Sequence, residues 1–456
     1  MRSKIASPRT RPVSMRRLAI ASCVGTTIEL ADFGLFALAA VMVFPHIFFP
    51  ALGDAAGLTA SLATFGVAFV ARPFGSILFG HFGDRMGRKG TLVTTLTLMG
   101  VSTVLVGFIP PASQIGVLAP IILVTLRFIQ GLAVGGEWAG AVLTTAEYAP
   151  AGRRGFWSMF ASLGGGFGAI LSSALVVGGS LGMSDEDYLS WGWRVPFIAS
   201  IILVGVGLWA RLNIDETPVF KAEVERRGAP KAPFVQAFKA QPREIILASG
   251  TMLMIYSSYY LGVTFLTTYG GTHLGIARTP TLLMALAATV FYTIGIFLGG
   301  LTADRYGRRL TMAAAATAAV IFPLIMFPVL NSGGFAGLAV AMCITMFITG
   351  TATGPLGAFL SELFRTQYRY SAAGFSYNFA GIAGGAIPPL FAASITQAFG
   401  AYMYGVLVSL LSLLSLACVL LLKDNAGRDL TSEVGDARSR RSDVRTESSE
   451  RTRATT

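Results

Sequence analysis

Charged residues are scarce in this chain. Aspartate, glutamate, lysine and arginine make up 13% of its 456 residues, which is about half their share in an average soluble protein. Apolar and aromatic residues make up 53%, and the mean hydropathy is +0.64. So few polar groups exclude a soluble enzyme, a disordered chain and a collagen-like fibre. The composition predicts a protein that crosses a membrane many times.

Several motifs and pairings are also absent. The chain has no Gly-Lys dipeptide, and therefore no Walker-type phosphate loop, and it has no His-Glu-x-x-His motif. Its three cysteines, Cys23, Cys343 and Cys418, lie in apolar stretches without paired spacing, which indicates buried thiols rather than disulfides or metal ligands. We therefore expect no enzyme activity, no cofactor and no metal site.

Long apolar runs fill most of the remaining sequence. A helix needs about 20 mostly apolar residues to cross a bilayer, whereas the strands of a membrane β-barrel are shorter and alternate. Twelve runs meet the helical length: 18–44, 58–80, 91–109, 116–146, 156–181, 193–212, 244–270, 281–301, 310–330, 334–361, 370–398 and 401–422. The pattern predicts an all-α membrane protein with twelve spans.

Lysine and arginine lie almost entirely on one side of this map. With the N-terminus inside, the inner segments hold 31 of the 35 basic residues, whereas Arg194 and Arg278 lie at outer ends and Arg72 and Arg127 lie within spans. Basic loops face the cytoplasm, so both termini are predicted to be cytoplasmic in a bacterial-type inner membrane. The net charge of +12 then reflects orientation, and we expect no nucleic-acid partner.

A ten-residue pattern occurs twice. Residues 80–89 and 300–309 both fit G-x-x-x-D-R-x-G-R-[K/R], 220 residues apart, each between the second and third spans of a six-span half. A weaker echo places Glu147 and Glu362 after the fourth and tenth spans. Two duplicated halves joined by a polar linker are typical of a transporter that rocks about a site in mid-membrane.

The repeat divides the chain into five segments. They are a cytoplasmic tail (1–17), an N-terminal six-helix bundle (18–212), a cytoplasmic linker (213–243), a C-terminal six-helix bundle (244–422) and a cytoplasmic tail (423–456). The last segment is rich in Ser, Arg, Asp and Glu, a composition typical of disorder.

The repeated motif and the six-plus-six layout resemble the major facilitator superfamily over residues 18–422. Four longer blocks narrow the resemblance to its metabolite:proton symporters, the relatives of the α-ketoglutarate, shikimate, citrate and proline/betaine permeases. The blocks are Phe69-Val-Ala-Arg-Pro-Phe-Gly-Ser-Ile-Leu-Phe-Gly-His-Phe-Gly-Asp-Arg, Leu126-Arg-Phe-Ile-Gln-Gly-Leu-Ala-Val-Gly-Gly-Glu-Trp, Trp191-Gly-Trp-Arg-Val-Pro-Phe and Phe359-Leu-Ser-Glu-Leu-Phe. The resemblance implies two pseudo-symmetric bundles that work by alternating access.

Acidic side chains within the spans are candidates for proton coupling. Asp32 and Glu29 share one face of the first span, and Glu137 lies in the fourth. A carboxylate inside a membrane is costly and is a functional candidate by default, because changing exposure at a cavity could change its protonation. The alternative is a static ion pair of Glu29 or Asp32 with Arg72 or Arg127.

Substrate-binding candidates come from both halves. Arg127 has a planar fork that matches a carboxylate, and Gln130 lies on the same helix face; a structural pair of Arg127 with Glu137 is the alternative. The interiors of spans seven to twelve carry hydroxyls and amides but no charge, and their candidates are Tyr256, Tyr260, Tyr377 and Asn378. Leu30 and Ala31 stand where the resembling family has Trp-Tyr, which leaves room for a ring-bearing or branched acid.

The repeated motifs are candidates for a gate. Asp84 and Asp304 can accept hydrogen bonds from helix N-terminal amides, and the glycines permit tight turns. In the superfamily this motif bridges helices on the inner face and stabilises the outward-open state; a plain basic turn would explain the Arg and Lys but not the Gly and Asp. The predicted gate comprises Gly80, Asp84, Arg85, Gly87, Arg88, Lys89, Gly300, Asp304, Arg305, Gly307, Arg308, Arg309, Arg72, Glu147 and Glu362.

These features together predict proton-coupled uptake of a small organic carboxylate or zwitterion. The expected partners are the substrate, protons and the lipid bilayer, and we expect the chain to work as a monomer. A proton-coupled exporter of amphipathic compounds and a non-transporting membrane sensor are the alternatives. The absence of a coiled-coil tail disfavours osmosensing.

Overall fold

The computed structural model describes residues 14–180, 183–212, 216–217, 220–221, 224–225, 230–425, 427 and 430. All regular structure in these ranges is helical, with no strand. Most of the predicted N-terminal and C-terminal tails and part of the predicted linker lie outside the described residues.

Six long helices build the N-terminal half. They are α1 (Met15–Met42), α3 (Gly53–Arg85), α4 (Arg88–Gly107), α6 (Leu118–Tyr148), α7 (Arg154–Ser180) and α9 (Arg194–Leu212). The short helices α2 (Phe44–Phe48), α5 (Ala112–Ile115) and α8 (Asp185–Asp187) connect them at one end. These long helices are apolar on nearly every face, as expected for segments that contact lipid on one side and other helices on the other.

The C-terminal half contains more interrupted helices. After α11 (Pro233–Ala240), its seventh span consists of α12 (Pro242–Thr251), α13 (Leu253–Tyr260), a π-helical segment (Leu261–Phe265) and α14 (Leu266–Thr272). The remaining elements are α15 (Arg278–Tyr306), α16 (Arg308–Thr353), α17 (Leu356–Leu363), α18 (Arg369–Ala380), a second π-helical segment (Gly381–Ala386), α19 (Ile387–Phe399) and α20 (Ala401–Leu421).

The predicted span count follows from these helices. Eleven helical stretches of the described chain are long and apolar enough to cross a membrane. Two of them, Arg308–Leu330 and Gly334–Leu363, divide α16, and the second continues through α17. Gly334 has a positive φ of 50°, which ends one helix and starts the next. The twelfth span is the run from α18 to α19, which the π-helical segment divides into shorter pieces. The all-α, twelve-span fold is therefore confirmed.

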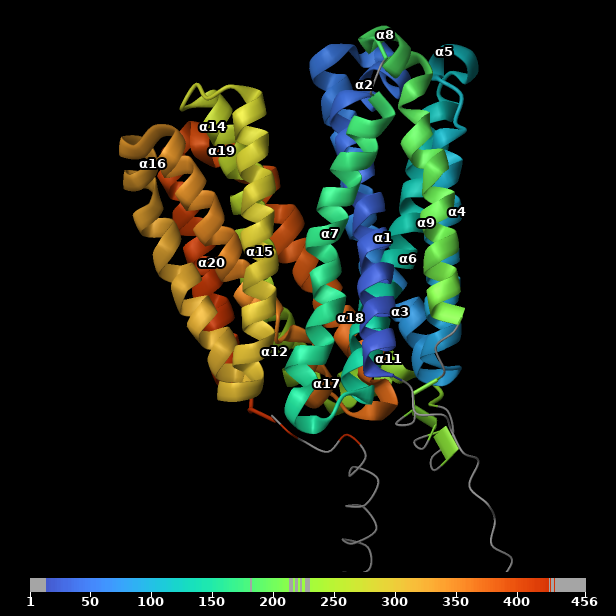
Figure 1. Ribbon diagram of the computed structural model, residues 1–456, viewed down its shortest axis with the longest axis vertical. Coiled ribbons are helices and arrows are strands. Elements are labelled where there is room, and N and C mark those ends of the chain that lie inside the picture. The colour runs from blue at the N-terminus through green and yellow to red at the C-terminus, as the bar shows by residue number, and fades with distance from the viewer. Residues whose placement is uncertain are drawn as a thin grey trace, which may run out of the picture.

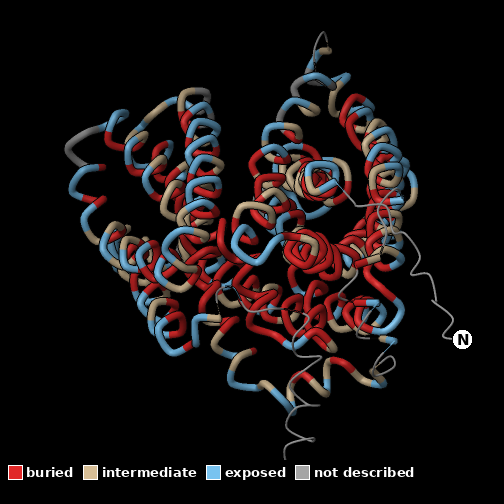
Figure 2. Tube along the Cα trace, turned by 60° about the horizontal axis from the view of Figure 1, so that its bottom comes forward, coloured by how far each residue is buried: buried red, intermediate tan, exposed pale blue. Residues whose placement is uncertain are grey.

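The two halves lie side by side and are in contact mainly at one end (Figure 1). We call the end where Asp84 and Asp304 lie the motif end, and the opposite end, with α2, α8 and α14, the far end. The ribbons of the halves converge toward the motif end and diverge toward the far end. Buried residues concentrate where the halves meet (Figure 2).

Glycines allow the closest helix contacts within the N-terminal half. A Cβ atom on Gly131 would lie 2.6 Å from the backbone oxygen of Ala68, and one on Gly135 would overlap the backbone oxygen of Arg72. Helix α6 therefore packs directly on the backbone of α3, the small-residue mode of packing inside membranes. This contact fixes Arg72 close to the helix that carries Arg127.

Candidate transport site and gate

Asp84 caps a helix of the opposite half. Its carboxylate accepts hydrogen bonds from the backbone N–H groups of Tyr370 (3.0 Å) and Ser371 (2.8 Å) and from the Ser371 hydroxyl (2.7 Å). Helix α18 begins at Arg369, so these are first-turn amides that have no partner within the helix. A negative charge at this position is also favoured by the helix dipole.

Asp304 makes the same contact in the reverse direction. Its Oδ1 and Oδ2 atoms accept from the backbone N–H groups of Gly155 and Phe156, both at 2.8 Å, at the start of α7. Each half thus supplies the carboxylate that caps a helix of the other. The amide contacts predicted for both aspartates are present, and they relate the halves by a pseudo-two-fold.

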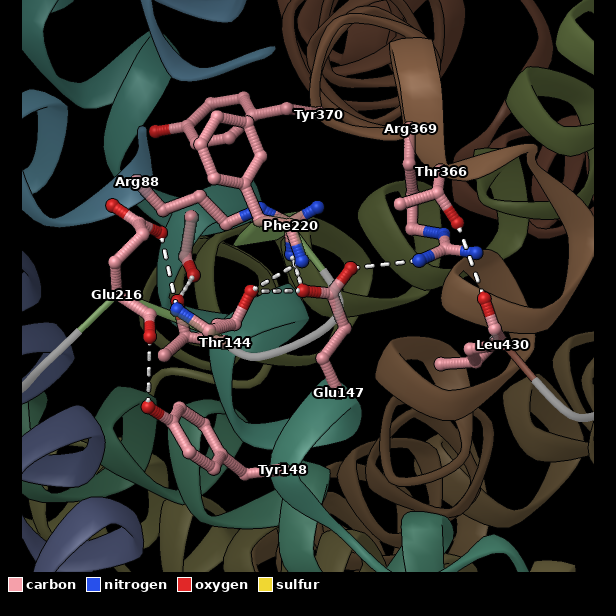
Figure 3. Close-up of polar contacts among 12 residues, drawn as sticks. Arg88, Thr144, Glu147, Tyr148, Glu216, Phe220, Thr366, Arg369, Tyr370 and Leu430 are labelled. Carbon is pink, nitrogen blue, oxygen red and sulfur yellow. Dashed lines mark hydrogen bonds and ion pairs between the residues drawn. The ribbon is translucent and has the colours of Figure 1, made fainter. Parts of the chain in front are cut away.

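Two glutamates repeat this symmetry with arginines. Glu147 binds Arg88 of its own half at 2.5 Å and Arg369 of the other half at 2.7 Å (Figure 3). Glu362 in turn binds Arg308 of its own half at 3.2 Å and Arg154 of the other half at 3.1 Å. All four arginines are buried. Sequence reasoning missed Arg154, because a basic residue at an inner helix end is also what membrane orientation requires.

The glycines of the two motifs serve the same interface. Gly87 and Gly307 have φ values of 114° and 100°. Gly87 joins α3 to α4, and Gly307 joins α15 to α16. A Cβ atom on Gly80 would lie 2.9 Å from Ser371, and one on Gly300 would lie 3.1 Å from the backbone oxygen of Gly155. The helices of the two halves can therefore approach only where a side chain is missing.

The other basic residues of the motifs lie outside these contacts. Arg85 is exposed, and the Arg305 guanidinium lies over the Tyr306 ring at 5.2 Å. The Lys89 backbone N–H donates to Glu216 at 3.1 Å, and the Arg309 side chain donates to the backbone oxygen of Leu420. Their predicted part in the gate stays a prediction.

A second layer of contacts closes the interface toward mid-membrane. The Tyr377 ring stacks on Trp138 with centroids 3.7 Å apart, and the Tyr370 hydroxyl donates to the backbone oxygen of Gly136. Asn378, a predicted substrate ligand, donates from Nδ2 to the backbone oxygen of Gly135 at 2.9 Å. Its amide nitrogen thus already bridges the halves.

Asp32 and Arg127 are joined through two uncharged side chains. The Arg127 Nη1 donates to Gln130 at 3.1 Å, the Gln130 amide donates to Thr103 at 2.8 Å, and the Thr103 hydroxyl donates to Asp32. All four residues are buried. Thr103 was missed from the sequence because threonine in a helix usually bonds its own backbone, as this one also does to Met99.

Aromatic rings enclose both arginines of the central region. The Arg127 guanidinium lies over the rings of Phe36, Phe33 and Phe65 at 4.1, 4.7 and 5.3 Å. Arg72 lies over Phe33 and Phe69 at 4.5 and 4.6 Å. Rings at these distances stabilise a desolvated cation. Arg72, which the sequence assigned to the gate, is thus in the central region beside Arg127.

Glu29 lies close to several charged groups without bonding to any of them. It is within electrostatic reach of Arg72, Arg211, Glu137 and Asp32, yet its buried Oε2 has no hydrogen-bond partner among the described residues. A buried carboxylate without a partner is costly. The alternative ion pair of Glu29 with Arg72 or Arg127 is not seen among the described residues, and the part of Glu29 in proton coupling stays a prediction.

Glu137 is held by two partners that the sequence did not indicate. Arg211 of α9 forms an ion pair with its Oε1, and Thr95 donates to its Oε2 at 2.8 Å. Arg211, which the sequence counted only among the basic residues of the inner segments, is therefore a buried ion-pair partner within the N-terminal bundle. The alternative pair of Arg127 with Glu137 is not seen, because Glu137 binds Arg211.

These contacts predict a stability effect. Glu137→Gln should lower the free energy of unfolding by about 3–5 kcal/mol, because it leaves the Arg211 cation buried without its counter-charge. Thermal unfolding of the purified protein measures this loss. Glu186→Gln, at an exposed carboxylate of the far end, is the matched control; equal unfolding temperatures for the two variants would contradict a structural ion pair.

Tyrosines of the C-terminal half complete the central region. Tyr260 packs edge-on against Phe69 with ring centroids 6.2 Å apart, and Tyr256 lies 5.3 Å from Tyr377. Tyr260 and Tyr377 are partly exposed. The structure therefore brings the predicted tyrosines of the C-terminal half next to the charged residues of the N-terminal half.

Comparison with known proteins agrees with this geometry. The family model of the Major Facilitator Superfamily matches residues 30–388 and 271–451. The chain is 39% identical to the inner membrane metabolite transport protein YhjE of Escherichia coli K12, over 92% of this chain and 97% of that protein, and 36% identical to the shikimate transporter of the same organism, over 90% and 95%. Among solved structures, the proton:xylose symporter XylE bound to 6-bromo-6-deoxy-D-glucose superimposes with a TM-score of 0.73 at 18% identity, covering 91% of this chain and 98% of that one. The chain belongs to the major facilitator superfamily, and it is a multi-pass membrane transporter rather than an enzyme.

Proposed function

We propose that the chain imports a small organic carboxylate or zwitterionic metabolite together with protons, and that it does so as a monomer in the inner membrane. The observation that carries this proposal is the buried connection from Asp32 through Thr103 and Gln130 to Arg127. It combines a group that can bind a proton with a permanent cation, on the side of the central region that faces the tyrosines of the other half. The names of the relatives, a metabolite transport protein and a shikimate transporter, support the same class of substrate.

Charge balance gives a physical reason for coupling. Two acids, Glu29 and Asp32, and two arginines, Arg72 and Arg127, occupy the central region. An anion that enters alone adds a net negative charge where the dielectric is low, and a proton that enters alone adds a positive one. An anion and a proton that enter together leave the net charge unchanged. The protein can then change between its outward-open and inward-open states both when the site is loaded and when it is empty.

The motif end supplies the matching gate. Asp84, Asp304, Glu147 and Glu362 each bridge the halves in this structure, which is closed at that end. These contacts must all break before a substrate can pass between the central region and the motif end. Each contact is charge-assisted and either buried or, at Asp304, partly buried, so the closed arrangement is stable until a loaded site favours the other state.

Accumulation in proteoliposomes tests the proposed function. Labelled shikimate, benzoate, 2-oxoglutarate, citrate and glycine betaine are offered at equal concentrations, with and without an imposed inward proton gradient. At least one of these compounds should accumulate above its external concentration only with the gradient. Uptake of neutral or cationic compounds alone, with none of the carboxylates or the betaine competing, would contradict the proposal and favour an exporter.

Orientation provides a separate prediction. We propose that the motif end faces the cytoplasm, because the basic residues gather there. A cysteine at Glu186 near the far end should react with a membrane-impermeant maleimide in intact cells, whereas one at the exposed Met86 near the motif end should react only after lysis. The reverse labelling pattern would overturn the map.

A further inference from the structure

We propose that Arg72, rather than Arg127, holds the carboxylate of the transported substrate, and that the aromatic rings beside it select an acid with a cyclic body. This inference rests on the proposed function, because it assigns a binding residue and a narrower class to the same central site. It follows from the different surroundings of the two arginines.

Arg72 has a buried cation with no bonding partner. Its side chain makes no hydrogen bond or ion pair with any described residue, and the residue is 6% exposed. None of its three nitrogens has a hydrogen-bond partner among the described residues. The Nε atom is fully buried, whereas Nη1 and Nη2 keep some exposed surface. A guanidinium left in this state is costly unless a ligand supplies the counter-charge. A carboxylate would fit the fork of Nη1 and Nη2 through two parallel hydrogen bonds.

Within the described part of the chain, Arg127 also has an unpartnered Nε atom, but it differs in its hydrogen bonding and in its exposure. It is 1% exposed and donates to Gln130, and its Nη2 atom, although it has no hydrogen-bond partner among the described residues, is buried away from any incoming ligand. Glu29 lies within electrostatic reach of Arg72 and Asp32 within that of Arg127, but only Asp32 is also joined to its arginine by hydrogen bonds, through Thr103 and Gln130. The Arg127 guanidinium is enclosed by the rings of Phe33, Phe36 and Phe65. A substrate carboxylate would have to displace these groups to reach it.

The surroundings of Arg72 extend across both halves. Tyr256, Tyr260 and Tyr377 of the C-terminal half all lie within its electrostatic reach, and the last two are partly exposed. Phenol hydroxyls can donate and accept hydrogen bonds. A molecule held by Arg72 would therefore meet hydroxyl groups from the other half, which suits a substrate with hydroxyls of its own.

An aromatic wall, formed by Phe33, Phe65 and Phe69, lies beside Arg72. Phe33 lies 4.5 Å from Phe65 and 5.4 Å from Phe69 between ring centroids, and Phe33 and Phe65 are partly exposed. Such rings bury the faces of a flat apolar body better than they bury a flexible chain of charges. The site thus fits an alicyclic or aromatic monocarboxylate and excludes a compact dicarboxylate, since the second carboxylate would meet the wall.

Counterflow measures binding at this site without net proton movement. The compound tested is the one that wild type accumulates best among shikimate, benzoate, 2-oxoglutarate, citrate and glycine betaine. Proteoliposomes carry full-length wild type, Arg72→Gln, Arg72→Lys or Arg127→Gln. They are loaded with the unlabelled compound, and entry of the labelled compound from outside is followed. The half-saturating concentration is measured for this compound, for its primary amide where it is a carboxylic acid, and for acyclic acids as competitors. Melting temperatures of the purified proteins show whether each variant folds.

The proposal predicts a specific pattern. Arg72→Gln should raise the half-saturating concentration of the acid by about 10- to 100-fold, and Arg72→Lys should raise it by about tenfold, because a point-like ammonium lacks the fork. Wild type should prefer the acid to its amide, and Arg72→Gln should abolish that preference. Arg127→Gln should keep the preference and lose gradient-driven accumulation. Cyclic monocarboxylates should compete better than acyclic dicarboxylates.

Other outcomes separate this inference from the proposed function. If wild type transports a carboxylate but the acid-to-amide preference survives Arg72→Lys and Arg72→Gln, Arg72 is not the anchor and the inference alone fails. If Arg72→Gln does not fold, the half-saturating concentration of the acid in Arg72→Lys decides instead: a rise of about tenfold supports the inference, and an unchanged value overturns it. Loss of the preference in Arg127→Gln alone assigns the anchor to Arg127. Wild type that carries no carboxylate overturns both proposals.

Discussion

Asp32→Asn should reduce the accumulation ratio of the substrate from well above one to one, while exchange across equal gradients continues. The amide resembles the protonated acid in shape and charge but cannot release a proton. The substrate can still bind and cross, and the proton gradient no longer drives it. Gradient-driven uptake and counterflow, measured on the same proteoliposomes, distinguish these two activities.

Three variants serve as comparisons for this experiment. Glu186→Gln, at the exposed far end, should accumulate substrate like wild type. Glu29→Gln tests the second buried acid, and Glu137→Gln tests the acid that binds Arg211. If Asp32→Asn and both of these variants each accumulate substrate against a gradient, proton coupling lies outside the three acids.

Asp84→Asn should open the motif end. The side-chain amide keeps one oxygen but replaces the other with a donor, which faces the donors Tyr370 N–H and Ser371 N–H. Losing charge-assisted contacts of this kind shifts the equilibrium by about 1–3 kcal/mol, or about 5- to 150-fold. Ser158→Cys reports the shift, because Ser158 of α7 is fully buried against Gly357 of α17 in the closed interface.

The labelling experiment uses a chain in which Cys23, Cys343 and Cys418 are replaced by serine. The cysteine at Ser158 should react several times faster with maleimide in the Asp84→Asn background than in the parent. Asp304→Asn, on the symmetric contact, should act in the same direction, and Glu186→Gln should have no effect. Unchanged labelling together with unchanged uptake would exclude Asp84 from the gate.

The span pattern and the helix-capping contacts of Asp84 and Asp304 could be predicted because their signals are local. A run of about 20 apolar residues is long enough to cross the hydrocarbon core as a single helix, and a motif that occurs twice at equivalent places indicates two related halves. Asp84 and Asp304 follow glycines at fixed spacing, so their position at helix ends was readable from the sequence. Their partners on α18 and α7 were not, because those depend on how the halves pack.

The distance of Arg72 from the repeated motif could be worked out from its spacing along the helix. It lies twelve residues before Asp84 on the same helix α3, and at 1.5 Å per residue that places it about 18 Å from the motif end. The gate assignment of Arg72 followed from its place in the inner half of the second span and stays a prediction, although the rise of the helix separates Arg72 from the motif. The rings around Arg72 come from α1 and α3, and only the packing of these helices shows them.

Arg211 and Asn378 could not have been placed from the sequence. Arg211 ends a span on the basic side, where orientation alone accounts for an arginine, yet it turns inward to Glu137. Asn378 is a polar group in an apolar helix, which suggested a substrate ligand. The rotation of α18 against α6 points its amide nitrogen at the backbone oxygen of Gly135, and its part in substrate binding stays a prediction.

The direction of proton movement on addition of substrate tests the central claim most directly. Proteoliposomes with a pH-sensitive dye inside and no imposed gradient receive the transported carboxylate from outside. Wild type should acidify the interior as substrate enters, and Asp32→Asn should show no pH change during substrate entry. An interior that becomes alkaline as substrate enters, or a pH that stays constant in wild type during substrate entry, would contradict proton-coupled uptake.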